Sequence, residues 1–428
     1  MHAKPVLLCN ISIAGSVTSS VDKKMEKILL NSDMMDISLF AVKSIKQYYK
    51  PTSELLSMME IFRGMVNHCI RIGLENNTST LKKLSMLSYH QLQEYPILSY
   101  YKLNAISQAC GRLLQMKRSI KKGQKPKSPF VSRPYLVSCY GLKINGMLLS
   151  IPIGDRKFVN ILLNNHTVQK LSEQDIKARS FTITPDSLSI SVRKDVEQII
   201  PENVIGIDRN LRNITISTQT ENIMYKTTKL LSIKENTSHV IASLKRFDVR
   251  VKKHFQQRMG NRRSRRIQQH LHIISKDIVK RAVESKSMIV LEDLKGIRKL
   301  YRKGNGQGNK YRRKLNSWSF YELQRQIQYK SEWEGIPVRF VDPKRTSKLC
   351  PRCGDLLQED RLNRRKLLCI NCKKSMNRDV VASLNISYKG LARFTNPRGL
   401  PSEAVKRNVD EPLILRVDGS QLTLQPKR

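Results

Sequence analysis

The sequence predicts a multidomain α+β protein, and three observations support this fold class. The first half combines an alternating strand, an amphipathic helical stretch and several short β-hairpins. From Asn203 the pattern changes to strand, turn, strand, followed by two long helices and another buried strand. Two Cys-x2-Cys pairs then indicate a small metal-binding module embedded in this second half. A chain of 428 residues is long enough for two or three such domains.

The net charge indicates the class of partner. The chain carries 78 Lys and Arg residues against 35 Asp and Glu residues, which gives a formal charge of +43. Electrostatic attraction and counterion release both favour a nucleic acid as the partner of such a chain. A membrane is the rival polyanion, but no apolar run approaches the roughly 18 to 20 residues that span a bilayer. We therefore expect no membrane partner.

Residues 1–38 show no sustained period and are expected to form a poorly ordered N-terminal extension. The stretch PVLLCNISIAGSV resembles a signal peptide only weakly, because Asn10 and Ser12 interrupt its apolar part. Four cysteines are scattered rather than arranged as a disulfide framework, namely Cys9, Cys69, Cys110 and Cys139. A cytoplasmic, nucleoid-associated protein is therefore expected.

The next segments predict a helical unit inserted into a β-rich one. Residues 39–52 alternate as a strand, and residues 126–202 read as hairpins, so both belong to the β-rich unit. Residues 53–125 form the helical unit, whose first stripe is Leu55, Met59, Phe62 and Val66. The Lys-rich run at 117–129 is either a solvated linker, the simpler interpretation, or a phosphate-contacting strap.

Beyond Asn203, apolar periodicity predicts two long helices separated by the sequence GNRRSRR. The first is marked by Val240, Leu244, Phe247 and Val251, and the second by Ile267, Leu271, Ile274 and Ile278.

Three acidic residues occupy unusual positions. Asp208 and Glu292 each end an apolar strand, and Asp379 begins a predicted helix. Any single one is more simply interpreted as a strand-end or capping carboxylate. Together, carboxylates from separate elements can bind divalent cations, and a metal pair can hydrolyse a phosphodiester. The sequence therefore predicts a site for hard divalent cations in a protein that binds nucleic acid.

The four remaining cysteines form the pattern Cys-x2-Cys-x15-Cys-x2-Cys, which strongly indicates a tetrahedral structural zinc ribbon. A pair of redox dithiols is the alternative, but thioredoxin-like flanking residues are absent. Four thiolates leave no open coordination position, so we expect a structural role for this zinc. Its ligands are Cys350, Cys353, Cys369 and Cys372.

Three motifs occur in order along the chain: GIDRNLRN, VLEDLKGIRK, and TSKLCPRCG through CINCKKSMNRDVVASLNI. These motifs resemble those of the transposon-encoded TnpB proteins, which are relatives of type V CRISPR effectors. The resemblance is dense from Asn203 to about Ser387, and upstream only the layout is similar. It implies a RuvC-like, RNase H-type mixed sheet at 203–395 with the zinc ribbon at 346–376 embedded in it. It also implies a wedge domain (39–52 plus 126–202), a recognition domain (53–125) and a C-terminal tail (396–428).

The same resemblance implies a function. It places the three catalytic acids at Asp208, Glu292 and Asp379, which would bind two Mg²⁺ ions. It further implies a guide RNA from the transposon end and a double-stranded DNA target; no oligomeric state is predicted. The sequence departs from the family pattern at Asn377, Val381 and Lys373, where Asp, Asn and Gly are frequent.

Basic side chains near the acids are candidates for contacts with nucleic acid. The run at 298–314 interleaves cations with Tyr301 and Tyr311, which could stack on a base, although a solvated loop is equally compatible. GNRRSRR is more often a solvated charge cluster, but a backbone contact to guide RNA is expected here. The candidates are Arg262, Arg263, Arg265, Arg266, Arg302, Lys303, Lys310, Arg312 and Arg313.

An RNA-guided DNA endonuclease is therefore the leading hypothesis. A domesticated RNA-guided DNA-binding protein that represses transcription without cutting is the second. A zinc-ribbon factor of transcription or translation is a third, but it does not explain the three acids.

Overall fold

We describe residues 39–425 of a computed structural model, apart from 142, 155, 219, 244–248, 302, 303, 305, 361, 364, 396–411 and 419. Side chains at 249–252 and 392–395 are also outside the description. The predicted extension at 1–38 and the candidates Arg302 and Lys303 therefore lie outside the described residues. Within the described part, no helix combines the length and the apolar composition that crossing a bilayer requires.

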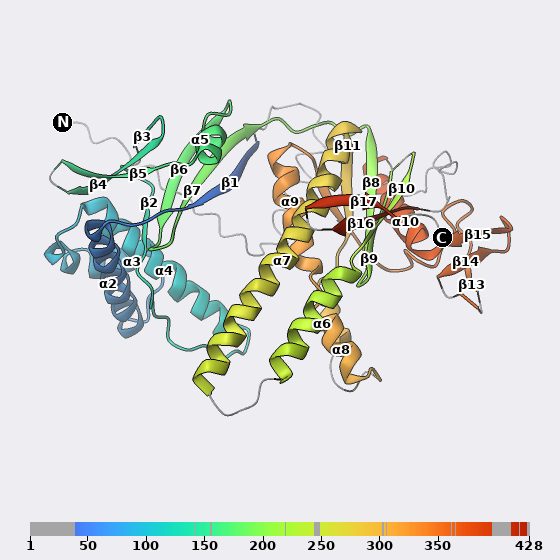
Figure 1. The fold of residues 1–428 in the computed structure, drawn as a ribbon, viewed down its shortest axis with the longest axis horizontal. Helices are drawn as coiled ribbons and strands as arrows, with labels where there is room; N and C mark the ends of the chain where they lie inside the picture. Colours follow the sequence, from blue (N-terminus) through green and yellow to red (C-terminus); the bar gives the residue numbers. More distant parts are fainter. Residues whose placement is uncertain are drawn as a thin grey trace. The chain divides into compact units, whose positions relative to one another are not determined.

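The first half contains two antiparallel sheets, coloured blue to green in Figure 1. One has the strand order β1-β7-β6-β2 and consists of β1 (Leu39–Tyr48), β2 (Leu136–Ser138), β6 (Ile176–Ile183) and β7 (Ser187–Val196). The other consists of β3 (Lys143–Asn145), β4 (Leu148–Gly154) and β5 (Lys157–Leu162), and α5 (Asn165–Leu171) follows it. The predicted strand at 39–52 and the predicted hairpins are confirmed.

The helices of this half are α2 (Ser53–Glu75), α3 (Leu81–Ser88), the 3-10 turn η1 (Gln91–Glu94) and α4 (Ser99–Lys121). The Thr52 hydroxyl accepts a hydrogen bond from the Leu55 amide at 3.3 Å and caps α2. All four residues of the predicted α2 stripe are fully buried. They belong to one hydrophobic cluster that also includes side chains of both sheets, so helices and strands share a single core.

A seven-stranded mixed sheet forms the centre of the second half, with the order β12-β11-β8-β9-β10-β16-β17. Strands β8, β9 and β10 are antiparallel, whereas β11 is parallel to β8 and β12 is parallel to β11. The bounds are β8 (Asn203–Arg209), β9 (Asn213–Ser217), β10 (Asn222–Lys226), β11 (Ser287–Glu292), β12 (Val338–Val341), β16 (Leu413–Asp418) and β17 (Gln421–Leu424).

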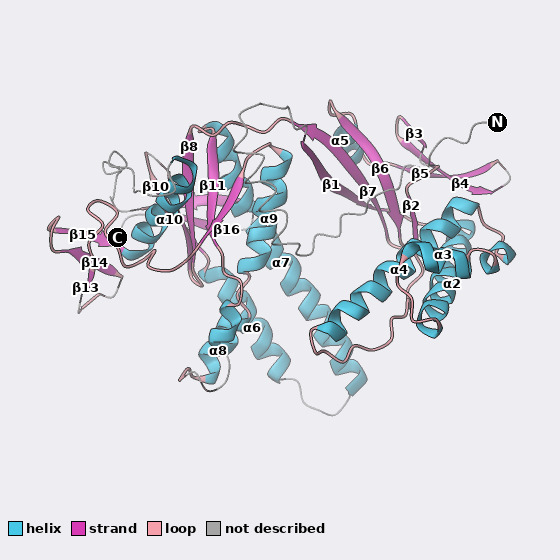
Figure 2. Ribbon diagram, turned by 180° about the vertical axis from the view of Figure 1, so that it is seen from behind, coloured by secondary structure: helices cyan, strands magenta, loops and turns pink. Residues whose placement is uncertain are grey.

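Helices cover both faces of this sheet (Figures 1 and 2). Side chains of α6 (Thr228–Ser243), α7 (Val249–Glu284) and α9 (Phe320–Trp333) join the larger apolar cluster on one face. On the other face, α10 (Arg378–Thr395) contributes Ile386 to a separate cluster with Val204 and Val290. Successive residues of β8 and β11 therefore alternate between the two faces, as the pleat requires.

The sequence GNRRSRR lies inside α7, so the prediction that it separates two long helices is wrong. Helix α6 ends at Ser243, and α7 runs through residues 260–266 without a break. Of the four markers of the predicted first helix, Val240 lies in α6 but is 42% exposed, and Val251 belongs to α7. The other two, Leu244 and Phe247, lie outside the described residues. Arginine is a good helix former, and the single Gly260 costs only about 1 kcal/mol in a helix interior. The sequence GNRRSRR suggested a loop because it is dense in charge, but it lies on the surface of a continuous helix.

Two glycines allow α10 to approach the sheet closely. A Cβ atom added to Gly206 in β8 would lie 2.0 Å from the carbonyl oxygen of Ser383 in α10. A Cβ atom on Gly390 in α10 would lie 2.4 Å from Val290 Cγ2 in β11. Helix α10 therefore approaches strands β8 and β11 so closely that a residue larger than glycine does not fit at either position.

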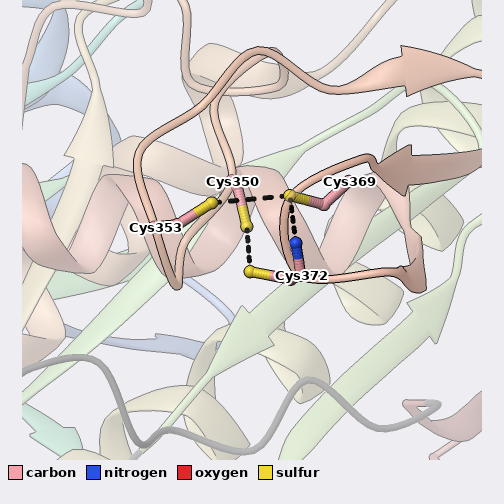
Figure 3. A group of neighbouring side chains, drawn as sticks. All are labelled: Cys350, Cys353, Cys369 and Cys372. Carbon is pink, nitrogen blue, oxygen red and sulfur yellow. Dashed lines mark hydrogen bonds between the residues drawn. The ribbon is translucent and has the colours of Figure 1, made fainter.

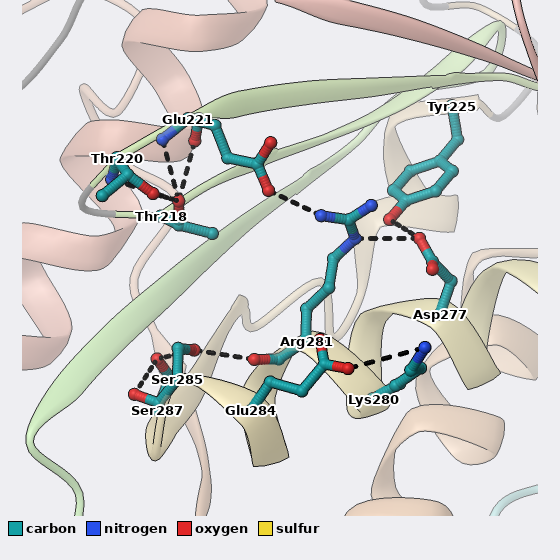
Figure 4. Close-up of polar contacts among 10 residues, drawn as sticks. All are labelled: Thr218, Thr220, Glu221, Tyr225, Asp277, Lys280, Arg281, Glu284, Ser285 and Ser287. Atoms are coloured by element: carbon teal, nitrogen blue, oxygen red, sulfur yellow. Dashed lines mark hydrogen bonds and ion pairs between the residues drawn. The ribbon is translucent and has the colours of Figure 1, made fainter.

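On the face of the large sheet opposite to α10, a polar network connects α7 to β10 (Figure 4). The buried Tyr225 hydroxyl donates a hydrogen bond to Asp277 Oδ2 at 2.6 Å. Arg281 donates to the same oxygen at 3.0 Å and pairs with Glu221 at 2.6 Å. Burial and the neighbouring Asp277 charge raise the pKa of Tyr225 well above its ordinary range, so the phenol remains a donor. The network positions the long helix against the sheet.

The remaining elements surround the carboxyl end of β11. They are η2 (Ile297–Tyr301), α8 (Asn309–Asn316) and the three-stranded ribbon sheet of β13 (Gln358–Glu359), β14 (Lys366–Cys369) and β15 (Lys374–Asn377). Residues 413–424, which the sequence analysis left in a C-terminal tail, form the strands β16 and β17 at one edge of the large sheet.

Candidate active site

Asp208 and Glu292 lie side by side because of strand register. Leu291 in β11 is paired with Ile207 in β8, so the next residues on these parallel strands are the two acids. Ile207 and Leu291 point into the larger cluster, which places both acids on the opposite face, toward α10. Neighbouring strands are about 4.8 Å apart. The side chains of Asp208 and Glu292 therefore extend from neighbouring positions on paired strands.

Asp379 reaches the same face from the first turn of α10. Its backbone amide donates to Asn377 Oδ1 at 2.9 Å, so Asn377 caps the helix. Asn210 then connects two of the acids: its Nδ2 lies 2.6 Å from Asp208 Oδ2 and 3.0 Å from Asp379 Oδ1. The structure thus brings elements from three distant parts of the chain together.

All three acids line one cavity of about 640 Å³. Thr346, Lys295 and Lys299 line the same cavity, and the last two precede or belong to the run at 298–314. This volume falls in the range of about 300–1,000 Å³ that is usual for ligand sites. The acids are nearly inaccessible as whole residues, with exposures of 6% for Asp208, 8% for Glu292 and 4% for Asp379. The cavity thus presents a concentrated set of carboxylate oxygens.

Burial has an electrostatic cost at this site. It raises the pKa of Asp208 well above its ordinary range, and the nearby charges of Glu292 and Asp379 raise it further. Burial also raises the pKa of Glu292, although the hydrogen bond from Thr346 Oγ1 to Glu292 Oε1, 2.8 Å long, opposes this shift. Carboxylates that repel one another in a low-dielectric site are the arrangement that a bound cation relieves.

Arg209 lies on the opposite side of β8 from Asp208 and is almost fully buried. Its Nη2 donates to the Glu292 carbonyl at 2.5 Å, and its Nη1 donates to Gln324 Oε1 at 3.0 Å. Burial lowers the pKa of Arg209 to about 10, so the guanidinium stays charged at neutral pH. One side chain thereby links the ends of β8 and β11 to the start of α9.

Asp379 accepts further hydrogen bonds from outside the predicted set. Asn213 Nδ2 lies 2.6 Å from Asp379 Oδ2, and Arg365 Nη1 forms an ion pair with the same oxygen. Arg365 comes from the segment just before β14, within the four-cysteine ribbon. Its side chain is half exposed, whereas that of Asp379 is buried.

The four predicted zinc ligands meet in one cluster (Figure 3), with all Sγ atoms within 4.8 Å of one another. The separation of 3.4 Å between the sulfurs of Cys353 and Cys369 is far longer than the roughly 2.05 Å of a disulfide. The cluster could therefore hold a metal ion such as zinc. Among the described residues it is the one set of cysteine, histidine or acidic ligands gathered so tightly. The three acids are spread more widely around their cavity.

The ribbon is packed directly onto the helix that carries Asp379. Val381 of α10 is fully buried in a cluster with Met376, Leu367 and two of the ribbon cysteines, Cys350 and Cys369. Met376 and Val381 flank Asp379 in sequence, so the ribbon core fixes the backbone on both sides of that acid.

The structure also accounts for the three departures from the family pattern. Asn377 retains a capping function, and Val381 replaces a polar residue in an apolar contact. Lys373 has a φ of 53°, a left-handed conformation in which a non-glycine residue is strained by roughly 1–2 kcal/mol.

The predicted basic contact residues occupy two helices. Arg262, Arg265 and Arg266 are exposed on α7, where Arg263 is partly buried, while Lys310 and Arg313 are exposed and Arg312 is partly buried on α8. Tyr311 is 52% exposed, but Tyr301 is buried and cannot stack on a base. The suggestion that Tyr301 could do so is wrong, because η2 turns this side chain inward.

Sequence reasoning missed Asn210, Asn213 and Arg365 as partners of the acids. The first two lie within five residues of Asp208, and their place in β8–β9 could have identified them. Arg365 gave no local signal, because its contact depends on how the ribbon is placed.

Residues 320–386 match the family model described as Cas12f1-like, TNB domain. A CRISPR-associated endodeoxyribonuclease Cas12f1 of Sulfoacidibacillus thermotolerans is 34% identical over 29% of this chain and 27% of its own length. A putative RNA-guided DNA endonuclease of Escherichia coli, InsQ, is 33% identical over 25% of this chain and 29% of its own. The solved mini-RNA-guided endonuclease CRISPR-Cas phi3 aligns over 87% of this chain and 97% of its own, with 12% identity and a TM-score of 0.47, which supports no inference.

A TnpB-like protein of Methanocaldococcus jannaschii is 35% identical over 271 residues, which is 60% of this chain and 96% of that relative. The match spans nearly the whole of that relative. The chain therefore belongs to the family of TnpB-like proteins.

Proposed function

We propose that the protein is an RNA-guided DNA endonuclease that hydrolyses DNA at Asp208, Glu292 and Asp379. The observation that carries this proposal is the convergence of the three acids on one cavity, at the ends of two adjacent parallel strands and at a helix start. The names of the Cas12f1 and InsQ relatives support nucleic-acid cleavage as the activity. The strand order β12-β11-β8-β9-β10 supports a RuvC-like, RNase H-type sheet.

The residues present fit a pair of Mg²⁺ ions. The donor set is carboxylate oxygen, the ligand type that magnesium prefers, and the raised pKa values of Asp208 and Glu292 reflect charge that a cation would balance. A pair of such ions would be held by carboxylate oxygens of Asp208, Glu292 and Asp379, which line one cavity. Such a pair, when bound, supplies an activated water and stabilises the leaving oxygen.

The chain's own groups prepare this site. Thr346 fixes one oxygen of Glu292, and Arg209 holds the backbone at the end of β11. Asn210 sets the separation of Asp208 and Asp379. Lys295 and Lys299, at the cavity wall, are suited to bind the phosphates that flank the reacting one. The four-cysteine cluster holds a structural zinc that keeps α10 in place.

The proposed partners are a guide RNA derived from the transposon end and a double-stranded DNA target. The net charge of +43 supports both. Base pairing with the guide would supply sequence specificity, and the exposed cations of α7 and α8 would bind the backbone.

One observation favours a second candidate, an RNA-guided DNA-binding protein that represses transcription without cutting. Asp379 already accepts from Asn210, Asn213 and Arg365, and a metal must compete with these donors.

Sequencing of the RNA that copurifies, followed by an assay of matched DNA with Mg²⁺ and with EDTA, tests the proposal. We expect cuts that require both the RNA match and Mg²⁺, and that Asp208→Ala abolishes while RNA binding survives. Tight binding without cuts would support the second candidate, and the absence of any discrete RNA would refute both.

A further inference from the structure

A second cavity, of about 560 Å³, lies in the helical segment between α2 and the chain that follows α4. None of the three acids or four cysteines lines it, and nothing in the proposed cleavage reaction uses it. Its volume is in the range of small-ligand sites. It combines aromatic side chains, Tyr95 and Phe130, with the charged side chains of Arg71 and Glu75. This combination indicates which class of ligand the cavity could bind.

The walls are aromatic and rigidly placed. Phe130 lines the cavity and is 67% exposed, so the face of its ring is accessible to a ligand. Tyr95 lines another side, and its hydroxyl lies 3.4 Å from Nδ1 of His68, whose Nε2 lies 2.9 Å from Gln91 Oε1. These contacts hold the Tyr95 ring in one orientation.

The segment that carries Phe130 is fixed to α2 rather than loose. Asn67 Nδ2 donates to the Val131 carbonyl at 3.0 Å, and Asn67 Oδ1 accepts from the Val131 amide at 2.8 Å. This two-way pairing holds the backbone beside Phe130. The exposed ring is therefore presented by an ordered backbone, as a stacking platform requires.

Cations precede Phe130 in the sequence, and two charged side chains line the cavity itself. The exposed side chains of Lys125 and Lys127 come from the Lys-rich run that leads into Phe130. Three peptide units separate Lys127 from Phe130, so their Cα atoms are at most about 11 Å apart. Arg71 and Glu75, both exposed on α2, form part of the cavity wall.

We propose that this cavity binds an unpaired nucleobase of a single-stranded nucleic acid. The base stacks on Phe130, the flanking phosphates lie on Lys125 and Lys127, and Arg71 and Glu75 contact polar edge atoms of the base. Glu75 accepts hydrogen bonds only, so it favours a base edge that carries an amino group. The inference rests on the nucleic-acid binding in the proposed function, but not on strand cleavage.

The test measures affinity of the full chain, in EDTA, for short single-stranded RNA and DNA probes and for the matching duplexes. Phe130→Ala should weaken binding of a single-stranded probe by about 5- to 150-fold, the range of one lost base stack. Met86→Ala is the matched control, because Met86 is a 77% exposed apolar side chain on the neighbouring α3, outside the cavity. The probe that loses affinity identifies the strand as RNA or DNA.

Salt dependence separates stacking from charge. Phe130→Ala should leave the slope of log affinity against log salt unchanged, whereas Lys127→Gln should reduce it by about 0.7 for one phosphate contact. Equal affinities of Phe130→Ala and Met86→Ala for every probe would overturn the proposal, and so would a loss confined to duplexes. Both results are binding affinities measured in EDTA, so they test this proposal even if the protein does not cut DNA.

Discussion

The guanidinium of Arg365, in the four-cysteine ribbon, forms an ion pair with the carboxylate of Asp379 at the start of α10. A cation from the ribbon therefore occupies an oxygen that the proposed Mg²⁺ site needs. Arg365→Gln should increase the rise in Tm that Mg²⁺ produces, because less charge competes for the carboxylate. Thermal unfolding with and without Mg²⁺ measures this difference.

Arg325→Gln is the control for Arg365→Gln, since Arg325 forms an ion pair with Glu322 on α9 and neither residue lines the cavity. The same Mg²⁺ response in both variants would mean that the ion pair does not compete with metal.

Asp208→Asn should abolish cleavage and also stabilise the metal-free protein. Burial and the charges of Glu292 and Asp379 raise the pKa of Asp208, so the folded state binds this proton more tightly than the unfolded state. The Asp208 contribution to the free energy of unfolding therefore decreases as pH rises above about 3.9, the unfolded value. The stability difference between Asp208→Asn and the unchanged protein should grow from pH 4 toward neutrality, as measured by urea unfolding in EDTA. A difference that is constant with pH would contradict the raised pKa.

Loss of a cysteine from the proposed zinc cluster should reduce cleavage through Asp379. If the cluster binds zinc, Cys369→Ser should lower the metal content, loosen the cluster of Val381 and Met376, and lower cleavage while RNA binding persists. Metal content by mass spectrometry, together with cleavage of matched DNA, measures both effects. Cys139→Ser, outside the ribbon, should change neither, and full activity in metal-free Cys369→Ser would show that the ribbon does not position the acid.

Gly206→Ala should destabilise the second half of the chain and separate α10 from β8. Its Cβ atom would collide with the backbone of Ser383, so we expect a loss of about 1–3 kcal/mol or more, as for other overpacked sites. Gly260→Ala is the matched control: no atom lies within 4 Å of the added Cβ, and the change should stabilise α7 by up to about 1 kcal/mol. Urea unfolding measures both, and similar stabilities would contradict the close packing of α10.

The adjacent placement of Asp208 and Glu292 could be predicted because each acid ends an apolar strand. Each apolar run occupies a parallel strand, and the apolar residues alternate between two buried faces. Once β8 and β11 pair, their common ends bring the acids together. Sequence alone does not give the register, but the position of each acid at the end of its run constrains it.

Other features could not be predicted from the sequence, because they depend on contacts between distant segments of the chain. The ion pair of Arg365 with Asp379 requires the ribbon to fold against α10, and no local pattern indicates this. The continuity of α7 was missed because residues 260–266 carry no apolar side chain that extends the stripe of Ile267 and Leu271 toward the start of the helix. Strands β16 and β17 are close in sequence and pair with each other, but the parallel pairing of β16 with β10 is nonlocal.

That pairing affects how the chain can be shortened. A version that stopped at residue 395 would retain Asp208, Glu292, Asp379 and the four ribbon cysteines. It would nevertheless uncover the outer edge of β10 and remove Leu415 and Val417 from the apolar layer beneath α7. An uncovered strand edge invites pairing with other chains. Such a minimal nuclease would therefore be prone to aggregate even though its chemistry was intact.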